Sequence, residues 1–236
     1  MSARVGHFFN LAAGIVAGML ALGACGAALY WLSLPERFPV ARVELKGDLQ
    51  QTTRAEIEAA LPRAAGNFFA VDLAAVRSGV ERLPWVRRVA VRRVWPAALE
   101  VTIEEHVALA RWGDDRLVNT HGETFSARTK LELPAFIAPA GSAHEVTRRY
   151  RRFAEILAPL GSGIDRVVLS ARHAWQLRLA NGQHLMLGRD ADAAEARLRR
   201  FVEVEGAALR DINRSFDTVD LRYPNGFAVR FAGARS

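Results

Sequence analysis

The distribution of charge along the chain changes near residue 35. Residues 8–34 contain no charged side chain, whereas residues 40–236 consist of short stretches in which apolar and polar positions alternate. At ~1.5 Å per residue, an apolar run of this length extends about 40 Å as a helix, which exceeds the ~30 Å hydrocarbon core of a bilayer. The pattern predicts a single transmembrane helix at 8–34, followed by water-soluble domains.

Two other interpretations of the apolar run are a cleaved signal peptide and a lipoprotein signal, since residues 22–25 read LGAC and end at Cys25. The apolar core of a signal peptide covers ~7–15 residues. Here the run continues past Cys25 to Leu34, which favours a retained anchor. Gly14 and Gly18 form a GxxxG motif that either packs against a second helix or simply reflects a span rich in glycine and alanine.

The charges that flank the run indicate its orientation weakly. Arg4 precedes it together with the terminal amine, whereas Glu36 and Arg37 on the other side nearly cancel. The positive-inside rule therefore predicts a cytoplasmic tail at 1–7 and a periplasmic location for the rest. The only cysteine is Cys25, which suits an oxidising compartment because no thiol follows the anchor. Two prolines make 35–39 a stiff linker.

The first soluble segment, 40–107, alternates strand and helix patterns. Thr53 and Glu56 have the spacing of a capping box, and Asp72 can cap a second helix that Pro84 ends. Alternating apolar positions indicate strands on either side of these helices. The expected elements are a strand at 41–47, helices beginning at Thr53 and Leu73, and a hairpin of strands at 88–92 and 99–104.

The hairpin carries four arginines between Trp85 and Trp95, and the chain has a net charge of +7, so nucleic-acid binding was a candidate function. Lysine occurs only twice, and this preference for arginine indicates GC-rich codon usage rather than selection for phosphate contacts. The alternation sets the arginines of one strand opposite the glutamates of the other. Such pairs neutralise the field that phosphate binding needs. The arginines are therefore interpreted as a solvated sheet face.

The second soluble segment, 108–236, reads as a β-rich domain with two helices. Each helix has an apolar stripe at helical spacing, formed in 145–158 by Val146, Tyr150, Phe153 and Leu157, and in 190–209 by Leu198, Phe201, Val202 and Leu209. The four arginines of the first helix are expected on its solvated face. The strands are expected at 108–112, 116–119, 164–171, 175–180, 184–188, 216–223 and 227–231. The predicted class is α+β, with helices on a mainly antiparallel sheet.

The sequence contains few of the motifs that are typical of catalytic, metal-binding or phosphate-binding sites. The six histidines have no metal-ligand spacing, no glycine-rich phosphate loop follows a strand, and no nucleophile elbow occurs. His121, in the stretch NTHGET, is interpreted as a turn residue. We therefore expect no catalytic residue, no metal, no cofactor and no small-molecule substrate.

A set of motifs in fixed order resembles the FtsQ/DivIB family of cell-division proteins, whose first periplasmic domain is a POTRA module. The matching residues are Pro84 and Trp85, Arg92 with Trp95 and Pro96, Glu104 and Glu105, Ala110 with Trp112, and Gly122 with Phe125. The stretches SARHAWQLRLANG, LGR, RLRRFVE and VDLRYPNGFAV are similar to the C-terminal domain of that family. The resemblance covers nearly the whole chain.

This resemblance implies a non-catalytic scaffold that spans the inner membrane once, at the division septum. It implies a POTRA domain at 40–107 with the order β-α-α-β-β and a C-terminal β domain at 108–236. It also implies that the scaffold links an early factor, FtsK, to the later pair FtsB and FtsL. The tail at 1–7 is shorter than that of many relatives, which puts in doubt any partner contact attributed to it.

The expected partner sites lie in both domains. The resemblance places FtsB contacts at Arg172, Arg222 and Tyr223, and FtsK contacts at Val91 and Arg93. From the residues alone, Phe227, Val229 and Phe231 alternate after an Asn225-Gly226 turn. The stretch 227–231 is then a final strand whose open edge could pair with a strand of FtsB. Alternatively, helix 190–209 covers this strand, and Tyr223 is a core aromatic that closes the hairpin.

Two other functions remain as alternatives. A POTRA module of an outer-membrane transport or secretion system would require a transmembrane β-barrel downstream, at ~10 residues per strand. The residues after the POTRA segment include two helices, which leaves little chain for such a barrel. An anchored periplasmic enzyme is the third possibility, and the scarcity of motifs for chemistry argues against it.

Overall fold

The computed structural model describes the chain except residues 1, 35–37, 62–66, 206–215, 224–225 and 232–236. The chain divides into two compact units, residues 1–105 and 106–236. Most of the linker predicted at 35–39 lies outside the described residues, as do Asn225 and Leu209.

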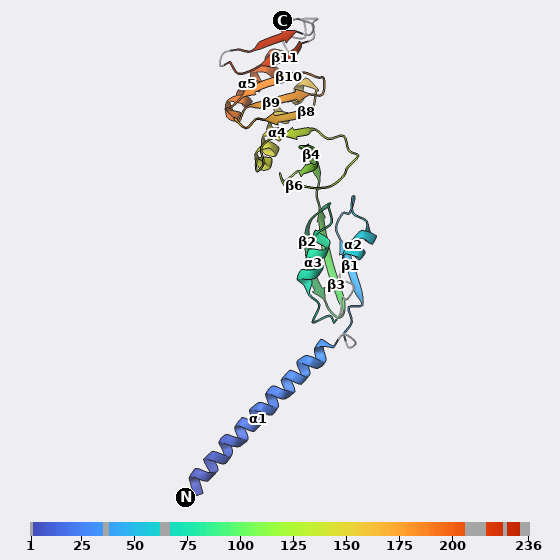
Figure 1. Ribbon diagram of the computed structural model, residues 1–236, viewed down its shortest axis with the longest axis vertical. Coiled ribbons are helices and arrows are strands. Elements are labelled where there is room, and N and C mark those ends of the chain that lie inside the picture. The colour runs from blue at the N-terminus through green and yellow to red at the C-terminus, as the bar shows by residue number, and fades with distance from the viewer. Residues whose placement is uncertain (1, 35–37, 62–66, 206–215, 224–225, 232–236) are drawn as a thin grey trace. The chain divides into compact units, whose positions relative to one another are not determined.

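Helix α1, Ser2–Ser33, is the predicted apolar segment (Figure 1). Within it, Gly14–Leu32 is long and apolar enough to cross a membrane, and none of that window is buried against the rest of the protein. The helix begins six residues before Phe8, because backbone hydrogen bonds continue a helix through polar residues. It ends two residues before Pro35, where the helical conformation becomes unfavourable.

Unit 1 has the predicted order β-α-α-β-β after α1. Its elements are β1 Arg42–Lys46, α2 Arg54–Ala60, α3 Leu73–Glu81, β2 Val86–Val94 and β3 Ala98–Glu105. The sheet order is β1-β3-β2, with β1 parallel and β2 antiparallel to β3. Both predicted caps are confirmed: Thr53 and Glu56 form a capping box, and the Asp72 carboxylate accepts from two backbone N–H groups of α3.

One apolar core holds the two helices of unit 1 on the inner face of its sheet. Its buried members come from alternate residues of β3, from β2 on both sides of a bulge, from one stripe of each helix and from the loop before α3: Ile57, Val71, Val76, Val80, Val86, Val89, Leu99, Val101 and Ile103. On the other face, Arg88 lies opposite Glu104 and Arg92 opposite Glu100, as the alternation predicted. Ion pairs join Arg92 to Glu100 and Arg87 to Glu104 between the two strands, whereas Arg93 binds backbone carbonyls.

Unit 2 contains a nine-stranded sheet among its described residues, with the order β12-β11-β10-β9-β8-β7-β4-β5-β6 (Figure 1). The strands are β4 Ala108–Trp112, β5 Arg116–Asn119, β6 Thr124–Phe125, β7 Ala135–Ile137, β8 Ile164–Leu169, β9 Trp175–Leu179, β10 His184–Gly188, β11 Phe216–Asp220 and β12 Ala228–Phe231. The helices are α4 Ala143–Leu157, the short 3₁₀ helix η1 Ala158–Leu160, and α5 Ala191–Val204. Most strand pairs are antiparallel, and the class is α+β, as predicted.

The parallel pairs arise where a helix or loop returns the chain to the same end of the sheet. Helix α4 connects β7 to its parallel neighbour β8, and α5 does the same between β10 and β11. The third parallel pair, β4 with β7, brings a strand that the sequence did not predict into the middle of the sheet. Strand β7 has only three residues, too few to display an alternating pattern.

Apolar residues of α4 and α5 cover the sheet of unit 2. Phe153 packs edge-on against Trp175 with ring centroids 5.7 Å apart, and Phe201 is fully buried. One expectation about α4 is wrong. Arg149 does not lie on a solvated face, because its Nη1 forms ion pairs with Asp192 at 2.8 Å and Glu195 at 2.9 Å on α5. A guanidinium thus links the two helices.

Candidate partner-binding site

Strand register brings most of the predicted FtsB residues to one end of the sheet in unit 2. Trp175 pairs with both Leu169 and Gly188, and Asp220 pairs with both Met186 and Ala228. The β8–β9 turn, the ends of β10 and β11, and the start of β12 therefore lie at the same end. At ~4.8 Å per strand, the turn and the end of β11 are separated by about 10 Å.

Arg172 and Tyr223 are both exposed at this end of the sheet. Arg172 lies in the β8–β9 turn, next to His173, which has a positive φ of 59°. Tyr223 follows β11 and is 54% exposed. Its side chain is therefore not the core aromatic that the alternative interpretation required, and it is available to a partner.

Arg222 is paired within its own segment. Its Nε and Nη2 donate to the two carboxylate oxygens of Asp220, with distances from 2.5 to 3.0 Å, and its backbone N–H donates to the same carboxylate at 3.0 Å. The Arg222 hydrogen bond lowers the pKa of Asp220, and the reciprocal bond raises the pKa of Arg222. Any carboxylate of a partner must therefore compete with Asp220 for this guanidinium.

The backbone around Gly188 brings a second arginine to Arg222. Gly188 has a φ of +87°, and a Cβ there would lie 3.4 Å from Cγ of Arg222 and 3.5 Å from Nη1 of Arg197. Arg197 comes from α5 and donates to the carbonyl of Leu187 at 3.0 Å. The sequence analysis did not assign Arg197 to the site, although Arg197 is the first residue of RLRRFVE, one of the family stretches.

Strand β12 occupies the end of the sheet, paired on one side with β11. Val229 and Phe231 of the strand, and Phe227 just before it, are partly buried and pack on the core, and Phe227 contacts Phe201 of α5 edge-on with ring centroids 5.7 Å apart. Ala228 and Arg230 between them are exposed. The apolar side chains of this strand thus face inward, while Gly226 precedes it and Asn225 lies outside the described residues.

The predicted FtsK residues lie on β2, an edge strand of the sheet in unit 1. Val91 is half-buried opposite Val101. Arg93 differs from the expectation of an independent exposed side chain. Its Nε donates to the carbonyl of Phe68 at 2.8 Å, and its Nη2 donates to the carbonyls of Phe69 at 3.3 Å and Val71 at 2.7 Å. Arg93 therefore anchors a loop as well as lying at an edge.

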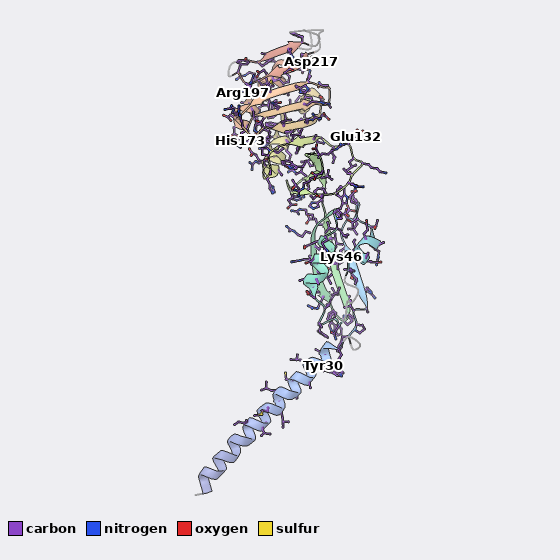
Figure 2. All side chains as sticks on the ribbon, viewed as in Figure 1. Tyr30, Lys46, Glu132, His173, Arg197 and Asp217 are labelled. Carbon is purple, nitrogen blue, oxygen red and sulfur yellow. The ribbon has the colours of Figure 1, made fainter. Side chains whose placement is uncertain are left out.

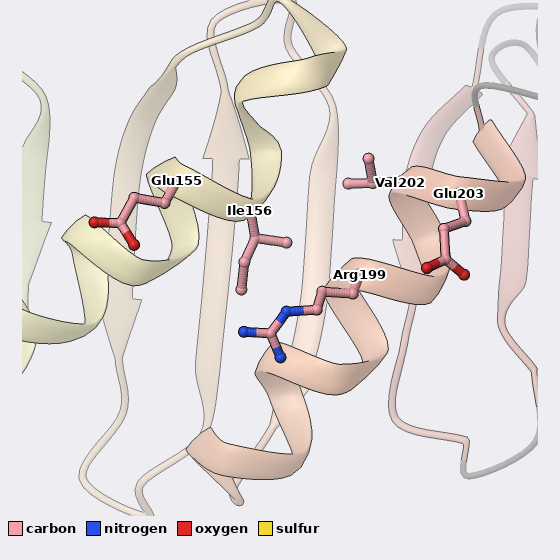
Figure 3. Close-up of a pocket in the computed structure, with 5 residues that line it drawn as sticks. All are labelled: Glu155, Ile156, Arg199, Val202 and Glu203. Carbon is pink, nitrogen blue, oxygen red and sulfur yellow. The ribbon is translucent and has the colours of Figure 1, made fainter.

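Two open cavities lie beside α4. One, of about 370 Å³, lies between α4 and α5, where Ile156 and Arg199 point toward each other with Glu155, Val202 and Glu203 around them (Figure 3). The other, of about 460 Å³, is lined by Thr120, His121, His144, Thr147, Arg148, Arg151, Arg152 and Glu155. His121 is in a turn, as predicted. In the part of the chain that the structure describes, no three His, Cys, Asp or Glu side chains are placed to hold a metal ion.

Comparison with known families matches both units. Residues 38–106 match the family described as "POTRA domain, FtsQ-type", and residues 110–222 match "Cell division protein FtsQ/DivIB, C-terminal". The chain belongs to the FtsQ/DivIB family of cell division proteins. This membership confirms the resemblance found in the motifs, and it does not favour a role in outer-membrane transport.

Individual relatives cover most of the chain. It is 41% identical over 232 residues to the cell division protein FtsQ of Burkholderia pseudomallei, which covers 96% of this chain and 93% of the relative. It is 42% identical over 185 residues to FtsQ of Nitrosospira multiformis, covering 78% of each. Identity to FtsQ of Escherichia coli is 34% over 229 residues, covering 92% of this chain and 79% of the relative. Together with helix α1, these relatives identify a single-pass membrane protein of cell division.

Proposed function

We propose that this chain is a non-catalytic scaffold of the bacterial division machinery in the cell inner membrane at the septum. Residues 1–7 are cytoplasmic, and the POTRA domain at 40–107 and the β domain at 108–236 are periplasmic. The scaffold links the early protein FtsK to the later proteins FtsB and FtsL through protein-protein contacts, and FtsB binds directly by strand pairing. Family membership and the apolar helix α1 support this proposal.

The main support for the proposed FtsB contact is that β12 is the last strand in the order of the sheet. One edge of β12 pairs with β11, and the other pairs with no strand among the described residues. An open edge presents backbone N–H and C=O groups that a strand from another chain can satisfy. Because Phe227 and Val229 pack inward, main-chain hydrogen bonds supply most of the recognition along this edge.

Side chains that follow β11 or lie in the β8–β9 turn, at the same end of the sheet as the start of β12, give the contact specificity. Tyr223 is exposed and offers a rigid ring with a polar tip, which is typical of interface residues that contribute strongly to binding. Arg172 and Arg222 lie at the same end and can bind carboxylates bidentately. Since Asp220 already occupies Arg222, an acidic FtsB residue gains this contact only by displacing or sharing that ion pair.

Affinity of the full-length protein for FtsB tests the proposal. We expect Tyr223→Ala to weaken binding by about 2 kcal/mol or more, roughly 30-fold, while thermal stability stays level because the side chain is exposed. Leu131→Ala, at a 52% exposed side chain of the same unit, is the matched control and should change neither. An Arg172→Glu, Arg222→Glu double variant should also lose affinity.

Hydrogen exchange of β12 tests strand pairing separately. Adding FtsB should slow exchange of those β12 amides that β11 leaves unpaired. Unchanged affinity in both variants, together with unchanged exchange in β12, would remove this edge from the mechanism. Equal loss of stability and affinity in Tyr223→Ala would instead show that the side chain supports the fold and does not contact FtsB.

A further inference from the structure

The side chain of Asn67 attaches the POTRA unit to the end of the membrane helix. Its Nδ2 donates to the carbonyl oxygens of Leu32 at 2.5 Å and Leu34 at 2.7 Å, and its Oδ1 accepts from the N–H of Phe69 at 2.8 Å. Asn67 is 2% exposed. Carbonyls in the last turn of a helix have no intrahelical partner, so these bonds satisfy acceptors that the end of α1 would otherwise leave open.

Aromatic rings continue from the helix into the same unit. Trp31 of α1 contacts Phe38 edge-on at 6.3 Å, Phe38 contacts Phe69 at 5.2 Å, and Phe69 contacts Phe68 at 5.2 Å. Trp31 is 47% exposed and Phe69 46%. The row of rings is thus contiguous, and two of its members present about half of their surface to the surroundings.

The β2–β3 turn adds a further exposed aromatic residue to this end of unit 1. Trp95 is 80% exposed, and two residues earlier Arg93 holds the carbonyls of segment 67–71. The carbonyl of Ala97, in the same turn, accepts from the N–H of Ala41 at 2.8 Å. One end of the unit therefore contains segment 67–71, turn 95–97 and residues 38–41, which follow the connection from α1. The N–H groups of residues 50–52 bind Glu105 at the opposite end.

The hydrogen bonds from Asn67 to Leu32 and Leu34, together with the short connection that follows α1, form a tether. This tether keeps the aromatic end of the unit near the bilayer surface. Helix α1 ends at Ser33, Leu34 follows it, and the described chain resumes at Phe38. At ~3.4 Å per residue, the connection from Leu34 to Phe38 extends at most about 14 Å. Tyr30, near the end of α1 (Figure 2), and Trp31 mark the depth at which aromatic side chains prefer the headgroup layer.

We propose that Phe69 and Trp95 lie in the lipid headgroup layer of the membrane that α1 crosses, so that the POTRA unit is docked on its own membrane. The interaction depends on aromatic rings rather than on cationic side chains. Arg92 is bound to Glu100, Arg93 to backbone carbonyls and Arg42 to Glu44 of its own strand, so these guanidinium groups cannot pair with lipid phosphates without losing these bonds. Docking is therefore insensitive to salt and needs no anionic lipid. It fixes the height of β2 above the bilayer.

Labelled full-length protein in phosphatidylcholine vesicles tests the docking. In a Cys25→Ala background, a nitroxide is attached at Ala70→Cys, beside Phe69, or at Asp48→Cys, which is exposed near the opposite end. We expect the label at 70 to be several-fold less accessible than the label at 48 to a water-soluble paramagnetic relaxer. Accessibility at 70 should not change in 0.5 M salt. A Phe69→Ser, Trp95→Ser double variant should raise it to the level at 48.

Three results would overturn the docking. The label at 70 could be as accessible as the label at 48, in which case this end of the unit stands in water. It could remain shielded in the double variant, in which case the tether alone holds it near the lipid. It could be shielded only in native membranes and not in pure lipid vesicles, which would assign the surface to a protein partner. Hydrogen exchange of β3 peptides verifies that each variant is folded.

Discussion

The guanidinium of Arg92 binds both carboxylate oxygens of Glu100, with N–O distances of 2.6 and 2.9 Å. The two residues lie directly opposite each other in β2 and β3, and Lys46 of β1 adds an ion pair at 2.7 Å. Glu100 is 6% exposed, so one buried carboxylate joins all three strands of unit 1. The hydrogen bond from Arg92, followed by that from Lys46, lowers the pKa of Glu100 to about 2.

This arrangement predicts an acid-dependent loss of stability in unit 1. Because the folded-state pKa of Glu100 lies below its ordinary value of 4.5, its stabilisation is complete above about pH 4.5 and is lost as the pH falls toward 2. We expect Glu100→Gln to reduce hydrogen-exchange protection of β3 at pH 7 and to have little effect near pH 2. Glu58→Gln, in an exposed ion pair with Arg54, should have little effect at either pH. An equal effect of Glu100→Gln at both pH values would contradict this account.

Arg93 should contribute to stability through the loop that it anchors. Arg93→Ala removes three bonds to the carbonyls of Phe68, Phe69 and Val71, and we expect a cost of about 1–2 kcal/mol. Hydrogen exchange of residues 67–71 should accelerate. Arg88→Ala, at an exposed position of the same strand, is the matched control and should change stability by less than about 0.5 kcal/mol.

Comparing Arg93→Ala with a second variant, Val91→Ala, separates folding from FtsK binding. If Arg93 contacts FtsK only through the loop it orders, both variants should weaken FtsK binding, and only Arg93→Ala should accelerate hydrogen exchange of residues 67–71. A loop that exchanges at the parent rate in Arg93→Ala would show that the carbonyl contacts contribute nothing in solution.

Arg149 should be the arginine of α4 that matters most for stability. Its side chain is 19% exposed and pairs with Glu195, which is 17% exposed, as well as with Asp192. Removing it leaves the largely buried Glu195 carboxylate with only the longer ion pair to Arg199 at 3.6 Å, so we expect Arg149→Ala to lower the free energy of unfolding by about 2 kcal/mol. Arg148→Ala, at the adjacent exposed position, should change it by less than about 0.5 kcal/mol. Urea denaturation measures both, and equal effects would argue against the helix link.

Gly122 should tolerate no side chain. Its φ is +81°, and a Cβ would lie 2.8 Å from the Cα of His144 at the start of α4. Gly141 has a similar φ of +82° but open space around it. We expect Gly141→Ala to cost about 1–2 kcal/mol from backbone conformation alone and Gly122→Ala to cost clearly more, because the β5–β6 turn must also move away from α4. Thermal unfolding of the two variants checks the difference.

Features that depend on residues close to one another in the sequence could be predicted from the sequence alone. Thr53 and Glu56 cap a helix across three positions, and Asp72 caps the next helix through N–H groups two and three residues ahead. The alternation in β2 and β3 predicted both the buried face and the arginine–glutamate register, because successive side chains in a strand point to opposite faces. The apolar run of α1 required no information from the rest of the chain. Family motifs in fixed order carried the rest of the functional assignment.

Only the tertiary structure shows which polar side chains already have hydrogen-bond or ion-pair partners within the protein. Arg93 and Arg149 look like their neighbours in the sequence, but the acceptors of Arg93 lie 22 to 25 residues away and Glu195 lies 46 residues from Arg149. The amide of Asn67 likewise reaches carbonyls 33 and 35 residues earlier. A guanidinium or amide can bind any acceptor within reach, so its partner depends on which segments folding brings together. Patterns along the chain therefore determined the anchor, the caps and the strand faces, and only packing decided which side chains remain available to a partner or a membrane.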